Sequence, residues 1–253
     1  MTENTLNILI TGASSGIGAA LAEHYAQNGA QNLFLSGRNE QRLNEVAERC
    51  SKHGAKVFPK IIDVCDREAM SAWIAEADKI APLNIIFANA GVSTGEENPT
   101  NIYNTFNTNI MGVLNTVTPA TEIYKSKPRD KQIIAITASI AGYHGLPSCP
   151  SYSATKACVK AYGEALRGSL REHKIQVNII CPGFVKSRIT DKNTCPMPFF
   201  MQADKAAAVI ANGIEKNYSL IAFPWPMRLA SWFISILPNR LSDFIYASLP
   251  HKV

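Results

Sequence analysis

The 253-residue chain has no C-x-x-C pair, although it contains six cysteines, at positions 50, 65, 149, 158, 181 and 195. No histidine stands at a zinc-ligand interval from them, so we expect no metal site and interpret the cysteines as reduced thiols of a cytoplasmic protein. The amino terminus also lacks a basic segment ahead of its first apolar run. Because Gly12 interrupts that run, we predict a buried strand there and no signal peptide.

Excess charge, linkers and repeats are scarce as well. The formal net charge is only +5, and its lysines and arginines are spread along the chain, so we expect no nucleic-acid partner. With 46% hydrophobic and 18% charged residues, the composition is that of a globular protein. No Gly/Ser/Pro-rich tract or internal repeat divides the chain, so we predict one domain over 1–253, with 224–253 as its apolar helical tail.

Short apolar runs alternate with longer helical patterns. Strands are predicted at Leu6–Ile10, Asn32–Ser36, Lys56–Ile62, Asn84–Ala88, Gln132–Thr137, Gln176–Cys181 and Leu220–Phe223. Helices are predicted at Ile17–Gln27, Glu40–His53, Arg67–Ile80, Ile102–Lys125, Tyr152–Glu172 and Ala203–Lys216. Apolar strands separated by helices indicate a parallel sheet covered on both faces, so the sequence predicts a doubly wound α/β (Rossmann) fold with seven strands.

A glycine cluster follows the first predicted strand and opens the first helix. Gly12, Gly16 and Gly18 have the spacing G-x-x-x-G-x-G, and Ser14, Ser15 and Ile17 lie between them. Glycines at such a turn let the backbone approach a diphosphate, whose charge the helix N-terminus favours. This context predicts a dinucleotide-binding loop.

The end of the second strand bears on the choice of cofactor. An acidic residue there would hold a ribose 2′-hydroxyl, but the chain has Gly37 followed by Arg38. A guanidinium favours a 2′-phosphate, so we expect NADP(H) in preference to NAD(H). The alternative for Arg38 is a surface residue capping a helix. Asp63 and Val64 end the third strand, where Asp63 would either contact the adenine or cap the next helix.

Ser139, Tyr152 and Lys156 form the candidate catalytic set. Tyr152 and Lys156 are four residues apart, which places both side chains on one face of a helix. A tyrosine has a pKa of about 10, and a nearby ammonium would favour its phenolate, so that one phenol could both give and take a proton. Ser139 would donate a hydrogen bond to a carbonyl oxygen as negative charge grows there.

Taken together, these motifs resemble the short-chain dehydrogenase/reductase family in its single-domain form. The resemblance runs from Leu6 to about Phe223 and rests on Thr11 to Gly18, Asn89-Ala90-Gly91, Asn109, Ser139, Tyr152-Ser153-Ala154-Thr155-Lys156 and Pro182-Gly183. It implies that Ser139 and Tyr152 bind the reacting oxygen, that Lys156 holds the nicotinamide ribose and tunes the tyrosine, and that Asn109 anchors a proton-relay water. It further implies cofactor contacts from Asn89, Ala90, Gly91, Pro182, Gly183, Val185 and Ser187.

Two further segments bear on the substrate and on possible partners. Pro196, Pro198, Phe199 and Phe200 stand where the family carries a mobile lid, and their apolar character suggests a hydrophobic substrate. The stretch 227–249 predicts two short amphipathic helices, whose apolar faces would cover the protein's own body, contact a dimer mate or enter a membrane interface. A homo-oligomer, with a dimer favoured, is the interpretation we retain.

The sequence thus predicts an NADP(H)-dependent oxidoreductase that interconverts a hydrophobic carbonyl compound and its secondary alcohol. One alternative is a non-catalytic NADP sensor, which the complete Ser, Tyr and Lys set disfavours. A second is a sugar-nucleotide epimerase or dehydratase, which can share the Tyr-x-x-x-Lys spacing.

Overall fold

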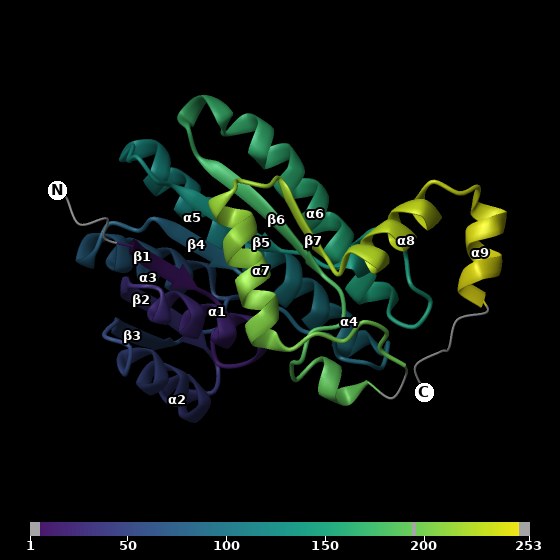
Figure 1. The fold of residues 1–253 in the computed structure, drawn as a ribbon, viewed down its shortest axis with the longest axis horizontal. Helices are drawn as coiled ribbons and strands as arrows, with labels where there is room; N and C mark the ends of the chain where they lie inside the picture. Colours follow the sequence, from purple (N-terminus) through teal and green to yellow (C-terminus); the bar gives the residue numbers. More distant parts are fainter. Residues whose placement is uncertain (1–5, 194–195, 248–253) are drawn as a thin grey trace.

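A seven-stranded, wholly parallel sheet forms the centre of the molecule, in a computed structural model that describes residues 6–193 and 196–247 (Figure 1). The strands are β1 (Leu6–Ile10), β2 (Ala30–Gly37), β3 (Lys56–Ile61), β4 (Ile85–Ala88), β5 (Ile133–Thr137), β6 (Gln176–Pro182) and β7 (Leu220–Phe223). Their order across the sheet is β3-β2-β1-β4-β5-β6-β7. All seven predicted strands are confirmed, and their ends move by no more than two residues.

Helices cover both faces of the sheet, as the alternating pattern predicts (Figure 1). The main ones are α1 (Gly16–Gln27), α2 (Glu40–Ser51), α3 (Arg67–Ile80), α4 (Pro99–Phe106), α5 (Gly112–Ser126), α6 (Pro150–Ser169) and α7 (Ala203–Glu215). Leu21, Val46 and Ile210 from α1, α2 and α7 share one buried apolar cluster. Trp73 and Tyr124 from α3 and α5 belong to a second. The sheet separates these two cores, so the doubly wound fold is confirmed.

The long helix predicted at Ile102–Lys125 has three parts. It begins earlier, at Pro99, because the Asn98 side chain accepts a hydrogen bond from the Asn101 N–H and Pro99 needs no such partner in the first turn. A π-helix, η1 (Asn107–Met111), then interrupts it before α5 begins. A π-turn carries one extra residue and is frequent at functional sites, and the sequence pattern did not predict it.

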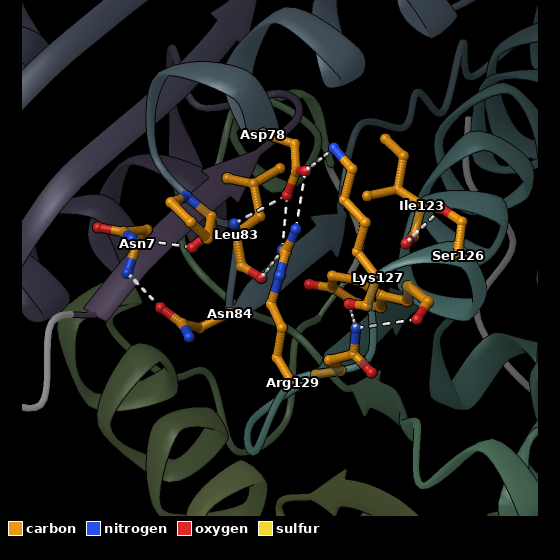
Figure 2. A network of polar contacts seen from close by, with 11 residues as sticks. Asn7, Asp78, Leu83, Asn84, Ile123, Ser126, Lys127 and Arg129 are labelled. Atoms are coloured by element: carbon orange, nitrogen blue, oxygen red, sulfur yellow. Dashed lines mark hydrogen bonds and ion pairs between the residues drawn. The ribbon is translucent and has the colours of Figure 1, made fainter.

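A buried carboxylate binds the loop that leads into β4, at the amino-terminal ends of the strands (Figure 2). Asp78 of α3 is 4% exposed and accepts two hydrogen bonds from Arg129, at 2.6 and 2.8 Å. Lys127 lies 3.1 Å away, and the Leu83 N–H donates at 3.1 Å. Burial alone would raise the pKa of Asp78, but the bonds from Arg129, Leu83 and Lys127 outweigh it and lower the pKa. This network therefore lies at the end of the sheet opposite the carboxyl ends of the strands.

The tail contains α8 (Trp225–Ser235) and α9 (Asn239–Ala247), which confirm the predicted helical extension and project from the body at one side (Figure 1). Large apolar side chains on them are about half exposed or more: Trp225, Leu229, Trp232, Phe233, Ile236, Leu241 and Phe244. On the inner side, the Met227 sulfur lies 2.9 Å from the point where a Cβ on Gly183 would stand. Of the three alternatives for the apolar faces, packing on the protein's own body does not cover these exposed side chains. In the part of the chain that the structure describes, no helix is long and apolar enough to cross a membrane.

Candidate active site

A cavity of about 560 Å³ lies at the carboxyl ends of the strands. The winding direction reverses between β1 and β4, and ligands of open α/β sheets bind at this switch point. Most of the predicted site residues line it: Gly12, Ser14, Ser15, Gly16, Ile17, Arg38, Asp63, Val64, Asn89, Ala90, Gly91, Ser139, Tyr152, Lys156, Pro182, Gly183, Val185 and Ser187. Gly18 and Asn109 are the two predicted site residues that do not line it.

The glycine loop is packed too tightly for side chains. Gly12 has φ +68°, and a Cβ there would lie 2.8 Å from the Ala90 Cα. A Cβ on Gly18 would clash with the Gly12 carbonyl oxygen and lie 2.7 Å from the Asn89 side-chain nitrogen, so Gly18 lets α1 pack closely against the glycine loop and the residue after β4. Gly16 abuts the other wall, because its Cβ would lie 2.9 Å from that of Ser187.

Thr11 and Asn89 join the ends of the three central strands. The Thr11 hydroxyl donates to the Phe87 carbonyl at 3.1 Å and accepts from the N–H groups of Asn89 and Ala90 at 3.0 and 3.1 Å. The Asn89 amide donates to the Thr11 carbonyl at 3.0 Å and accepts from the Thr137 hydroxyl at 3.2 Å. These bonds fix the backbone on which the cavity floor rests.

The three candidate catalytic side chains meet at one end of the cavity. Ser139 follows β5 as the N-cap of the short 3₁₀ helix η2 (Ile140–Gly142), and its Oγ accepts from the Ala141 N–H at 3.1 Å. Tyr152 and Lys156 lie in the first two turns of α6, and the Lys156 Nζ is 5.7 Å from the centroid of the Tyr152 ring. Lys156 is 3% exposed and donates to the Thr137 carbonyl at 2.8 Å.

Burial controls the protonation of this set. It raises the pKa of Tyr152 to about 12, against the lowering effect of a hydrogen bond with Ser139. It also lowers the pKa of Lys156 to about 8. The effects that shift the pKa of Tyr152 here include no contribution from the lysine charge, so the stabilisation of the phenolate by Lys156 stays a prediction. Tyr152 is a phenol at neutral pH, which suits a proton donor.

Asn109 lies in η1, is fully buried, and joins two segments that border the cavity. Its amide oxygen accepts from the Val92 N–H at 2.8 Å, while its amide nitrogen donates to the Val92 carbonyl at 2.9 Å and to the Thr155 hydroxyl at 3.0 Å. Thr155 in turn donates to the Tyr152 carbonyl at 2.8 Å. Both N–H donors of the amide are committed to these bonds, so Asn109 would hold a relay water only through an acceptor oxygen, on its side chain or its backbone.

Arg38 and Asp63 face each other at the opposite end of the cavity. Arg38 Nη1 lies 3.6 Å from Asp63 Oδ2, and both side chains are about half exposed. Burial would raise the pKa of Asp63, but hydrogen bonding from Cys65 and the charge of Arg38 lower it. The helix-capping alternatives for both residues are wrong, because Asn39 caps α2 and Asp66 caps α3.

The segment after β6 closes the third side. The Thr190 hydroxyl accepts a hydrogen bond from the Ser187 N–H at 2.8 Å and donates one to the Val185 carbonyl at 2.9 Å. These two bonds fix the turn. The aromatic residues of the predicted lid behave differently from expectation. Phe199 and Phe200 are 59% and 40% exposed and do not line the cavity, so they supply no apolar lining in this structure.

The sequence prediction missed several residues that line the cavity. They include Ser36, Asn39, Arg42, Asn104, Thr108 and Thr190. A positional signal exists for Arg42, which lies in the first turn of α2, four residues after Arg38 in the sequence. Asn104 and Thr108 come from α4 and η1, whose break the sequence pattern did not reveal.

The residues present fit a nicotinamide dinucleotide. The loop at Gly12 allows close backbone approach, and the Lys156 ammonium has three donors, of which one bonds to Thr137. At the end of β2, the Nε of Arg42 is buried and has no hydrogen-bond partner among the described residues. The cavity therefore offers hydrogen-bond donors at both ends, for the hydroxyl groups and the phosphates of such a cofactor.

The chain is similar to known proteins over most of its length. The family model for short chain dehydrogenases matches residues 6–196. An "uncharacterized oxidoreductase" of Myxococcus xanthus is 33% identical over 241 residues, covering 93% of this chain and 94% of the relative. An "11-beta-hydroxysteroid dehydrogenase-like 4A" protein of Arabidopsis thaliana is 30% identical, over 92% of this chain and 81% of its own.

Solved structures are similar over nearly the whole chain. A short chain dehydrogenase/reductase from Burkholderia phymatum in complex with NAD superposes with a TM-score of 0.83 at 25% identity, covering 100% of this chain and 99% of that one. A short-chain dehydrogenase from Sphingobium yanoikuyae in complex with NADPH gives a TM-score of 0.80 at 21% identity, with coverages of 97% and 96%. The Burkholderia structure spans the tail helices as well.

Proposed function

The chain belongs to the short-chain dehydrogenase/reductase family, and from that premise we propose that it is an NADP(H)-dependent oxidoreductase interconverting a carbonyl compound and a secondary alcohol. The observation that carries the proposal is the meeting of Ser139, Tyr152 and Lys156 at one end of a cavity whose other end holds Arg38.

Each side chain has a defined task in this proposal. The nicotinamide cofactor supplies or accepts the hydride. Ser139 donates a hydrogen bond to the substrate oxygen, which stabilises the charge that develops there. Tyr152 gives its phenolic proton to that oxygen during reduction and takes it back during oxidation. Lys156 binds the ribose hydroxyls through the ammonium donors that Thr137 leaves free.

Asn109 acts at one remove from the reacting atoms. Its amide holds the backbone of Val92 and the hydroxyl of Thr155, and thereby the turn of α6 that carries Tyr152. In the proposal it keeps the π-helix in place, so that a backbone carbonyl there holds the proton-relay water.

The preference for NADP(H) over NAD(H) is supported by the side chains at the end of β2. Gly37 replaces the acid that would bind a ribose 2′-hydroxyl, and Arg38 is a cation at the cavity wall. The similar structures were solved with NAD in one case and NADPH in another, so this preference rests on the chain's own residues.

A hydrophobic carbonyl compound is the proposed substrate class. Val92 and Ile189 line the cavity, and Phe199 and Phe200 are exposed in the segment that pairs with Val185 through Met201. Lid segments close over bound substrates, which would bring these aromatic rings into contact. The name of the Arabidopsis relative refers to a steroid dehydrogenase, which suits a large apolar substrate.

The experiment titrates the purified protein with NADPH and NADH by fluorescence and then screens hydrophobic ketones for loss of absorbance of the reduced cofactor. We expect tighter binding of NADPH and turnover with some apolar ketones. Tight binding without turnover on a broad panel would favour the sensor function instead. Tighter binding of NADH would contradict the interpretation of Arg38.

For the tail, we propose that α8 and α9 pair with a second copy of the chain. The outer side of α8 is an apolar stripe, because Trp225, Leu229 and Trp232 recur at helical intervals, and its C-cap Ile236 continues the stripe. Only Arg228 is charged in α8, whereas electrostatic membrane binding uses clusters of basic residues. A membrane interface is therefore the less favoured occupant.

Light scattering and vesicle flotation decide between these occupants. We expect a dimer that the double substitution Trp232→Ser, Phe233→Ser converts to a monomer, while Tyr218→Ser, an exposed aromatic elsewhere, leaves the dimer intact. A monomer that floats with phosphatidylglycerol vesicles would contradict the dimer.

We also propose a cytoplasmic location, in keeping with the free thiols of the five described cysteines; Cys195 lies outside the described residues.

A further inference from the structure

Two buried polar atoms without hydrogen-bond partners lie at the end of β2. They are the Oγ of Ser36 and the Nε of Arg42, and both residues line the cavity. Buried polar atoms are nearly always paired in native proteins, because an unpaired group loses its bonds to water. Such atoms at a cavity wall indicate that a polar ligand completes them.

The two arginines at this end of the cavity differ in their ion pairs. Arg38 already has a carboxylate of the protein, that of Asp63, within ion-pair distance at 3.6 Å. Among the described residues, Asp63 is the one acid that lines the cavity, and Arg42 forms no ion pair with any of the described acids. Arg42 therefore provides the net positive charge at this wall.

The position of Arg42 is set by the start of α2. The Asn39 side chain caps that helix by accepting the Arg42 N–H at 3.0 Å. Arg42 thus lies in the first turn, where the helix N-terminus adds to the attraction for an anion. From this position Arg42 lines the cavity wall.

We propose that Arg42 binds the adenosine 2′-phosphate of NADP(H) together with Arg38 and is a determinant of cofactor preference. The inference rests on the proposed NADP(H) dependence and deepens it. A 2′-phosphate carries close to two negative charges at neutral pH, so one arginine that is already paired with Asp63 leaves it under-compensated. Arg42 supplies the second cation, and its Nε gains the missing acceptor.

Isothermal titration with two small nucleotides isolates this contact. The probes are 2′,5′-ADP and 5′-AMP, which differ only in the 2′-phosphate. We expect Arg42→Gln to weaken the binding of 2′,5′-ADP by about 10- to 100-fold and to change 5′-AMP binding less than about threefold. Arg49→Gln is the matched control, because Arg49 lies on the same helix, pairs with Glu23 and does not line the cavity.

The outcomes separate this inference from the function on which it rests. If the wild-type protein binds 2′,5′-ADP no tighter than 5′-AMP, the NADP(H) preference itself is wrong, and the role of Arg42 fails with it. If the wild type prefers 2′,5′-ADP, Arg38→Gln removes the preference and Arg42→Gln keeps it, the role of Arg42 alone is wrong. Equal weakening of both nucleotides by Arg42→Gln would indicate an adenosine or structural contact and would also overturn the proposal.

A second variant guards against misfolding. Arg42→Lys retains the charge but loses the planar fork of donors, so we expect it to weaken 2′,5′-ADP binding by about 3- to 10-fold with 5′-AMP unchanged. Unchanged affinity for 2′,5′-ADP in both the Gln and the Lys variants would contradict the inference.

Discussion

The side-chain nitrogen of Lys156 donates a hydrogen bond to the backbone carbonyl of Thr137 at 2.8 Å, which joins α6 to the last residue of β5. This bond holds a buried ammonium beside the Tyr152 ring and leaves two of its donors for a ligand. Burial lowers the pKa of Lys156 to about 8, so the ammonium loses its proton within the working pH range of many enzymes.

The affinity for NADPH should therefore depend on pH through Lys156. We expect the dissociation constant to stay level from pH 7 to about 8 and to rise as the ammonium loses its proton above that value. Fluorescence titrations between pH 7 and pH 10 measure this. The variant Lys156→Met should bind more weakly throughout and lose the pH dependence; an identical pH profile in that variant would show that another group is responsible.

Lys156 should also reduce the stability of the fold. Its pKa in the folded protein is below its ordinary value of about 10.5, so the penalty for burying the charge is fully present below pH 8 and disappears as pH rises toward 10.5. We expect Lys156→Met to raise the melting temperature by about 2–8 °C at pH 7 while abolishing turnover.

Calorimetry at pH 7 and pH 10 tests that trade-off. The gain should be smaller at pH 10, where the wild-type lysine is largely neutral. A variant that melts lower than the wild type at both pH values would show that the bond to Thr137 contributes more to stability than the buried charge removes.

The network around Asp78 should make the fold sensitive to acid. Its pKa is lowered, so the stability it provides is present above about pH 4, the ordinary value of an aspartate, and is lost as pH falls further. We expect Arg129→Met to lower the free energy of unfolding by about 3 kcal/mol at pH 7, because it leaves a buried carboxylate short of its main partner.

Urea unfolding at pH 7 and near pH 3 measures this difference, which should shrink at the lower pH. Lys52→Met is the control, because Lys52 and Glu48 form an exposed pair on α2 and should contribute less than about 1 kcal/mol. Equal effects of the two substitutions at pH 7 would contradict the structural role given to Arg129.

The sequence predicted the fold and most of the cavity wall because both depend on local patterns. Apolar runs separated by helical periodicity specify a parallel sheet, and glycines after β1 specify a close backbone approach such as that of Gly12 to Ala90. Side chains at the carboxyl ends of parallel strands then meet without further information. Ser139 and Arg38 lie at the cavity for this reason.

Features that depend on tertiary packing were not predicted. The π-turn at Asn109 arises where a buried amide must reach Val92 and Thr155 together, which no helical periodicity reveals. The raised pKa of Tyr152 likewise follows from burial, not from its spacing to Lys156. The exposure of Phe199 depends on how the lid turns, and residue type alone does not fix that.

The most direct test of the central claim compares wild-type protein with Tyr152→Phe, measuring NADPH binding by fluorescence and ketone reduction by absorbance. Because the substitution removes only the phenolic oxygen, we expect NADPH affinity to change less than about threefold and turnover to fall by about 10²- to 10⁴-fold. Turnover close to that of the wild type would show that Tyr152 is not the proton donor and would contradict the proposed function of this site.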